Sequence, residues 1–239
     1  MARSIKRPLC PVVLVALVLA AAAALADVTI VMENETTTPD GKQTTTVTQY
    51  YTETKMRNEY GEASAMIIDL DEERMVTLMP ATKQYLVQTF KALRDQAAHM
   101  RFAKPEVKIE ETDEEAEING FACHKVLVRM KTAGSEYTTE YWMAKDVEGI
   151  EDVQAFQKAM YKAYEGIPQQ RANMEATKPL FDKGLFPIKT VTKHTMPDGE
   201  MVTTMTVKEI KKGDLDEALF EIPDDYEELS FGVPGGDAE

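Results

Sequence analysis

The segments 64–70 and 74–79 constrain the fold most, because both are short strand-like runs with apolar side chains on both faces. Met66 and Ile68 fall on one face of the first run and Ile67 falls on the other, since side chains alternate along a strand. An antiparallel sheet with one face in water carries apolar residues on the other face only. We therefore expect these strands to lie in a sheet that is covered on both sides.

Turn signals divide the rest of the chain into further short strands. Asp-Gly and Asn-Gly pairs supply the backbone angles that tight hairpin turns need, and they occur at positions 40–41, 119–120 and 198–199. The first and last pairs each follow a proline between Thr-rich runs, which predicts two similar hairpins produced by the same turn chemistry. The predicted strands cover 28–33, 44–51, 54–59, 64–70, 74–79, 84–88, 105–112, 121–132, 136–145, 186–195 and 200–211.

Apolar residues at helical spacing predict helices over 89–101 and 151–164, and a weaker pattern indicates a third over 169–178. Phe90 begins the apolar stripe of the first helix, and Thr89 stands at its N-cap position, where a hydroxyl can accept a backbone hydrogen bond. These helices are the expected cover for one face of the sheet.

Residues 1–26 have the order of a secretory signal peptide. A basic start precedes an almost unbroken apolar run at 9–25, and Ala24 and Ala26 are the small residues that signal peptidase reads. Cleavage after Ala26 leaves a mature protein that begins at Asp27, in the periplasm or outside the cell, with no stable membrane anchor. The alternative is an uncleaved anchor, because the apolar run approaches the length of a membrane span.

The mature chain contains no linker rich enough to divide it, so residues 27–228 are expected to form one domain. The acidic segment 214–228 is expected to dock Phe220 and Ile222 on that domain, and 229–239 to form a flexible tail.

The charge of the chain excludes several classes of partner. The sequence has 27 Lys and Arg against 41 Asp and Glu, a net charge of −14. The predicted signal holds three of the basic residues and no acidic one, so the mature chain has 24 against 41, or −17. Nucleic acid binding, and docking on an anionic membrane by charge alone, need clustered basic residues and are not expected. Loss of the signal also leaves one cysteine, Cys123, so no intrachain disulfide can form.

No motif in the sequence predicts catalysis, a metal site or a cofactor. Cys123 and His124 are neighbours on a predicted strand, where they point to opposite faces and cannot share a proton. Lys125 and Arg129 fall on the face of Cys123, where their charge would lower the pKa of its thiol. A Cys/His-dependent enzyme therefore stays open as an alternative.

Aromatic residues and methionines are concentrated on the predicted strands. Adaptable methionine and aromatic walls suit an apolar ligand, so these residues are candidates for the wall of a cavity between the sheet and its helices. The alternative is an ordinary packed core. The candidate wall consists of Tyr51, Met56, Met66, Met75, Met79, Tyr85, Tyr141 and Trp142.

The order of several loose motifs resembles a bacterial exported family of unknown function, the DUF4412 type. The motifs are Lys55-Met56-Arg57-x-Glu59, Met66-Ile67-Ile68-Asp69, Met75-Val76-Thr77-Leu78-Met79-Pro80, Lys83-x-Tyr85, Ile118-Asn119-Gly120-Phe121-x-Cys123, Glu140-x-Trp142-x-Ala144-Lys145 and Phe220-x-Ile222-Pro223. This family is similar to the periplasmic lipoprotein carriers of the LolA and LolB type. The resemblance implies an α+β fold in which a strongly curved antiparallel sheet, an open half-barrel, wraps around two or three helices. It also implies an apolar hollow and no catalytic residues.

The leading hypothesis is an exported, non-catalytic protein that binds a hydrophobic ligand in the hollow, such as an acyl chain, a lipid or a lipidated protein. The alternative is an envelope structural or interaction protein whose acidic surface docks a basic partner. The run 106–117, with seven acidic residues, is expected to be a solvated strand at a sheet edge and is the candidate surface for such docking.

Overall fold

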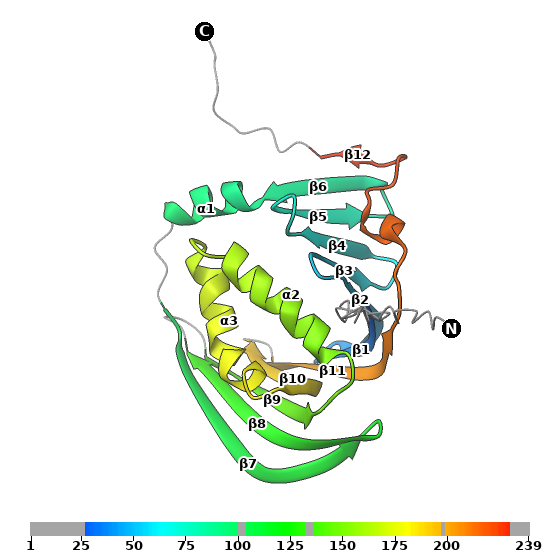
Figure 1. Ribbon diagram of the computed structural model, residues 1–239. Coiled ribbons are helices and arrows are strands. Elements are labelled where there is room, and N and C mark those ends of the chain that lie inside the picture. Colours follow the sequence, from blue (N-terminus) through cyan, green and yellow to red (C-terminus); the bar gives the residue numbers. More distant parts are fainter. Residues whose placement is uncertain (1–26, 100–103, 132–135, 197–198, 230–239) are drawn as a thin grey trace, which may run out of the picture.

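The structure, a computed structural model, describes residues 27–99, 104–131, 136–196 and 199–229. The predicted signal and all but the first residue of the predicted tail lie outside these segments. The described residues form one open, curved sheet of 12 strands with helices in its hollow, as Figure 1 shows. The two edge strands are not paired with each other, so the sheet does not close into a barrel. The predicted open curved sheet with a few helices is confirmed.

Strands make up most of the described chain. They are β1 (Val28–Thr38), β2 (Gly41–Tyr51), β3 (Lys55–Tyr60), β4 (Ser64–Asp69), β5 (Arg74–Met79), β6 (Gln84–Thr89), β7 (Glu106–Ile118), β8 (Phe121–Lys131), β9 (Glu136–Lys145), β10 (Leu185–Met196), β11 (Gly199–Lys212) and β12 (Glu227–Glu228). The helices are α1 (Phe90–Ala98), α2 (Ile150–Ala163), α3 (Pro168–Phe181) and the short 3-10 helix η1 (Glu217–Phe220).

Two runs of antiparallel strands meet in the middle of the sheet. The order is β12-β6-β5-β4-β3-β2-β1-β11-β10-β9-β8-β7, so β1 pairs with β11 although they lie at opposite ends of the chain. One pair, β12 with β6, is parallel and departs from the antiparallel sheet that the resemblance implies. The chain crosses the outside of the sheet after β11 and reaches the far edge running in the direction of β6 (Figure 1).

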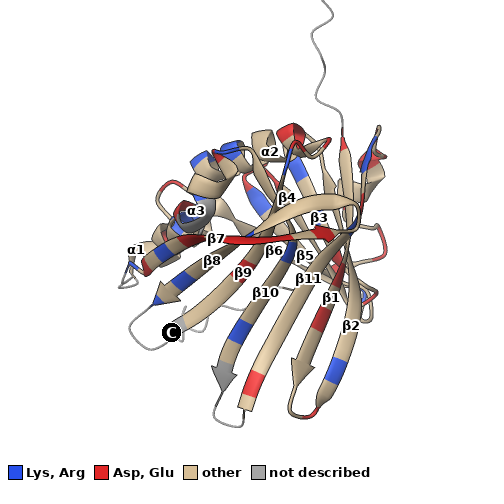
Figure 2. Cartoon of the chain, turned by 90° about the horizontal axis from the view of Figure 1, so that it is seen from below, with Lys and Arg blue, Asp and Glu red and all other residues tan. Residues whose placement is uncertain are grey.

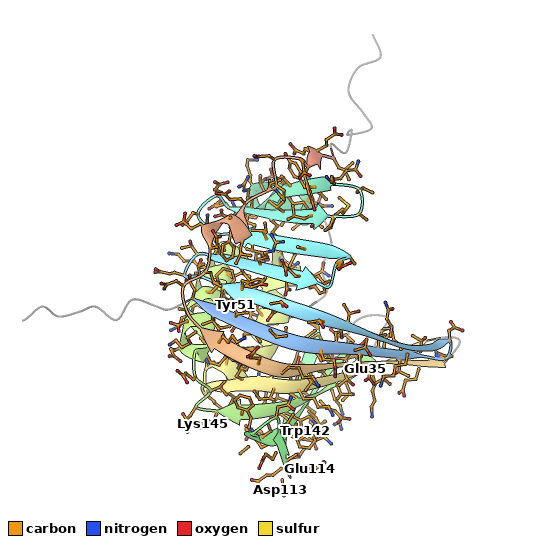
Figure 3. All side chains as sticks on the ribbon, turned by 90° about the vertical axis from the view of Figure 1, so that its right-hand side faces the viewer. Glu35, Tyr51, Asp113, Glu114, Trp142 and Lys145 are labelled. Atoms are coloured by element: carbon orange, nitrogen blue, oxygen red, sulfur yellow. The ribbon has the colours of Figure 1, made fainter. Side chains whose placement is uncertain are left out.

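The two similar hairpins lie side by side, because β1 of the first pairs with β11 of the second. A Cβ atom placed on Gly199 would lie 2.7 Å from Cγ of Pro39, and the φ angle of Gly199 is +141°, so glycine is required at this contact. The long strands project past the rest of the sheet, with Glu35 on the projecting part and Tyr51 at the end of β2 nearer the helices (Figure 3).

The helices agree with the sequence in place and differ from it at their ends. Thr89 caps α1 as predicted, and its hydroxyl oxygen accepts a hydrogen bond from the Ala92 N–H at 3.1 Å. The third helix starts one residue earlier and ends three residues later than predicted. Pro168 fits the first turn, and Leu180, which is 1% exposed, is held in the core at the other end. Among the described segments, no helix is both long enough and apolar enough to span a membrane.

The strands β4 and β5 are covered on both faces, as their sequence predicts. On the concave face, Met66, Ile68 and Met75 belong to the main core beneath the helices. On the convex face, the two strands and a C-terminal strap, residues 213–226, form a second core. The strap runs along the outside of the sheet, shown in orange in Figure 1, and buries Phe220 as predicted. The second core contains Ala65, Ile67, Val76, Leu78 and Phe220, with Leu215, Leu219, Ile222 and Tyr226 packed against it.

The acidic run lies on β7, which is an edge strand of the sheet, as expected. The strand extends to residue 118 rather than 112, with an irregularity in its pairing between Glu111 and Glu115. Ile118 pairs with Phe121 across the turn. Pairing with β8 therefore keeps the acidic stretch in an extended conformation, although acidic residues have a low propensity for strands.

Candidate ligand-binding site

The concave face of the sheet brings together several residues of the predicted cavity wall. Tyr51 and Met56 are buried there, and Met66 and Met75 pack against the same core cluster. Met79 shares this face, because it lies four residues after Met75 on β5 and side chains alternate along a strand.

The other three predicted wall residues divide between the two faces. Tyr141 lies on the concave face, as the register of strand pairing shows when it is followed from β1 through β11 and β10 to β9. There it packs near Leu180 of α3. Trp142 follows directly on β9 and packs against the main core, and its ring centroid lies 5.8 Å from the Lys125 Nζ atom. Tyr85 packs against the second core, under the strap. The structure therefore brings Trp142 to the main core and places Tyr85 in the second core.

Phe156 of α2, and Tyr164 directly after this helix, pack against the concave wall. Phe156 meets Tyr51 edge to face, with ring centroids 5.7 Å apart. The Tyr164 hydroxyl lies 3.7 Å from the Met75 sulfur, and its ring packs edge-on against Phe90. Burial raises the pKa of both the Tyr51 and the Tyr164 phenols, so both stay neutral. The wall serves here as the packing surface for α2.

An open groove runs between α2 and α3 and has a volume of about 690 Å³. Met160, Met174 and Phe181 form its apolar floor and also pack against the main core. Its rim is polar and charged and includes Gln154, Gln157, Lys158, Lys178, Glu151 and Asp182.

Hydrogen bonds tie the two helices together toward both ends of this groove. At one end, the Tyr161 hydroxyl donates to the Glu175 carboxylate at 3.1 Å, and Arg171 Nε donates to the same oxygen at 3.0 Å. These two hydrogen bonds lower the pKa of the Glu175 carboxyl, with Arg171 the larger cause. At the other end, the Gln154 amide donates to the Phe181 carbonyl at 3.5 Å.

Sequence reasoning places Met160 on the stripe of α2 that faces the sheet, and it does not single out the other groove residues. A second stripe on α2 was the available signal, since Gln154, Lys158 and Tyr161 recur at helical spacing. Met174 and Phe181 lie two turns apart on the next helix and complete the pattern. The groove itself depends on how the two helices lie together, which no local pattern specifies.

The environment of Cys123 does not activate its thiol. The side chain is buried on β8 and donates a hydrogen bond to the Phe121 carbonyl at 3.4 Å. Burial raises the pKa of this thiol. Lys125 is bound by Glu114 at 3.0 Å and lies 3.6 Å from Glu140, so the prediction that nearby cations lower the thiol pKa is wrong.

Acidic residues lie along most of β7, as Figure 2 shows. Glu110 pairs with Arg129 at 3.0 Å, and Glu111 pairs with Lys183. The remaining acidic side chains of this strand, apart from Glu114, form no ion pair or hydrogen bond within the described part of the chain. They are Glu106, Asp113, Glu115 and Glu117.

The fold is thus an open curved sheet that holds two of its helices in the hollow. The chain belongs to the family described as Domain of unknown function (DUF4412), whose model matches residues 29–226. This match confirms the family that the order of motifs predicts. A search of the curated proteins finds no match to the chain.

Several solved structures are similar to this one at low sequence identity. A LolA superfamily protein, NE2245 from Nitrosomonas europaea, is 8% identical over 82% of this chain and 90% of its own, with a TM-score of 0.41. A DUF1329 family protein from Desulfovibrio piger is 8% identical over 84% and 91%, with a TM-score of 0.39. PNGF-II is 12% identical over 86% of this chain, which spans only 31% of the PNGF-II chain, with a TM-score of 0.40.

Proposed function

We propose that this protein is exported and binds a hydrophobic ligand, such as an acyl chain, without catalysing a reaction. The α2–α3 groove is the site. Its volume of about 690 Å³ lies within the range of small-molecule sites, and its floor combines two methionines with a phenylalanine. The groove is the observation that supports this proposal, because it combines an apolar floor with a polar rim on the surface of the domain.

The chemistry of the floor suits a flexible apolar chain. Methionine side chains are unbranched and polarisable, so Met160 and Met174 can adapt to ligands of different shape. The ring of Phe181 adds a rigid apolar surface between them and the rim. Contact of a ligand with Tyr51 would require Phe156 of α2 to move away, and contact with the rest of the predicted wall, at Met56, Met66, Met75, Met79 and Tyr141, stays a prediction.

Displacement of an uncharged fluorescent probe tests the proposal. N-phenyl-1-naphthylamine should bind the protein with increased fluorescence, and dodecanol should displace it. Phe181→Ala should weaken probe binding about tenfold, because the floor loses most of a ring's apolar contact. Val107→Ala, which truncates an apolar side chain that is 37% exposed on β7, should leave binding unchanged. The proposal fails if the wild-type protein neither binds the probe nor retains lipid in native mass spectrometry.

A second candidate function follows from the edge strand β7. Its free carboxylates offer negative charge beside an unpaired strand edge, which suits an extended basic segment of an envelope partner. Binding of a labelled oligolysine peptide that weakens with salt, and that Glu115→Gln with Glu117→Gln reduces, would favour this function. Binding that the double variant leaves unchanged would exclude β7 as the docking surface.

A further inference from the structure

We propose that the ligand of the α2–α3 groove carries a single negative charge, as a fatty acid carboxylate does, and that Lys158 binds this charge. The inference rests on the proposed function and names the chemical class of the ligand. It starts from the charges that line the groove, of which there are four: Glu151, Lys158, Lys178 and Asp182.

Three of these four charged groups have an ion-pair partner within the protein. Lys178 donates to the Asp182 carboxylate at 2.7 Å, one turn along α3. Glu151 accepts from Lys212 Nζ at 3.2 Å, and this ammonium also pairs with Asp152 at 3.1 Å. Lys158 forms neither an ion pair nor a hydrogen bond with any part of the chain that the structure describes. One unpaired ammonium, that of Lys158, therefore borders an apolar floor, in a protein whose net charge is strongly negative.

The place of Lys158 along α2 matches the open part of the groove. Gln154 and Tyr161 lie about one turn before and after it on the helix, and both are hydrogen-bonded to residues of α3. Lys158 lies between these two bridges and borders the same groove as Met174 and Phe181. A ligand whose head is bound by Lys158 can thus lay its apolar chain along the floor.

The rim favours a carboxylate over a more highly charged head group. A lysine ammonium is a compact point charge, whereas phosphate recognition favours the forked donors of arginine or several cations together. Glu151 and Asp182 also line the groove and hold Lys212 and Lys178, so a second negative charge on the ligand would meet no further unpaired cation of the groove lining. A single carboxylate on an unbranched chain meets both conditions.

Competition among ligands of equal chain length tests the inference. With N-phenyl-1-naphthylamine bound, dodecanoate should displace the probe from the wild-type protein at about fivefold lower concentration than dodecanol, the range expected of one partly exposed ion pair. Lys158→Ala should remove this preference and leave displacement by dodecanol unchanged. Lys158→Arg should keep the preference, and Lys162→Ala, one turn along α2 and outside the groove lining, should behave as wild type.

Failure of this inference is distinguishable from failure of the proposed function. If dodecanol displaces the probe as well as dodecanoate does, or if Lys158→Ala keeps the preference, the inference is overturned and ligand binding stands. Stronger displacement by dodecyl phosphate than by dodecanoate at pH 8 would also overturn it, because a phosphomonoester carries about two negative charges at that pH. If neither competitor nor probe binds, both proposals fail.

Discussion

Phe156 of α2 packs edge to face on Tyr51 of β2, with ring centroids 5.7 Å apart and ring planes at 69°. Both side chains are buried, and Phe156 is fully enclosed. This contact joins the helix to the centre of the curved sheet. It makes one residue of the predicted cavity wall the anchor of the helix that fills the hollow.

Replacement of Phe156 by alanine should therefore lower the free energy of unfolding by about 3–5 kcal/mol, because it leaves a cavity at the contact between helix and sheet. Urea denaturation followed by circular dichroism measures this loss. Phe156→Leu should cost less, since it keeps most of the buried volume. A loss below about 1 kcal/mol for the alanine variant would contradict the packing described here.

The C-terminal strap should be necessary for the stability of β4 and β5. Phe220→Ala should also cost about 3–5 kcal/mol, because this ring covers Ile67, Val76 and Leu78 on the convex face. Hydrogen exchange should then quicken more in β4 and β5 than in β9. Equal protection of these strands in the variant and the wild type would show that the strap does not stabilise the sheet.

The thiol of Cys123 should be inert in the folded protein. Burial both raises its pKa and blocks access, so a disulfide reagent at pH 8 should modify it at least about a hundredfold more slowly than in denaturant. The measurement needs a chain that begins at Asp27, which lacks Cys10. As a matched control, Ala122→Cys with Cys123→Ser moves the thiol to an exposed neighbouring position, where modification should be fast.

The cluster around Glu175 should stabilise the α2–α3 pair in a pH-dependent way. Arg171 and Tyr161 hold the pKa of this carboxyl below its ordinary value of 4.5. Because the folded-state pKa lies below the unfolded one, the stabilisation is complete at neutral pH and is lost as the pH falls through the folded-state pKa. Glu175→Gln should therefore be less stable than wild type at pH 7, and the difference should shrink toward pH 3.

Urea denaturation at several pH values checks this prediction. The exposed Glu165 provides a control, and Glu165→Gln should match wild type across the range. A difference between Glu175→Gln and wild type that grows as the pH falls would contradict the described cluster.

Local signals identified most of the secondary structure. Thr89 marks the start of α1 through its own hydroxyl, and the Asp-Gly and Asn-Gly turns separate strands whose residue types favour extended backbone. The signals failed at element ends, where distant contacts decide. Leu180 extends α3 because the core buries it, and Ile118 extends β7 because it pairs with Phe121.

The candidate site was less predictable than the fold. Alternation correctly separates Met66 from Ile67, but it does not say which face of the sheet becomes concave. The predicted wall therefore includes Tyr85, which lies in the core of the opposite face. The groove was missed because Met174 of α3 and Lys158 of α2 line it only once the two helices lie side by side.

The sequence by itself determined the strands, the helices, the two-sided cover of β4 and β5, the negative charge and the family. These properties depend on residue type, spacing and short turns, which act within a few residues of the chain. Only the tertiary structure decided which face of the sheet encloses the helices, what fills the hollow and where an open groove remains. Those outcomes depend on the curvature of the sheet and on packing between segments far apart in the chain, and no local pattern encodes either.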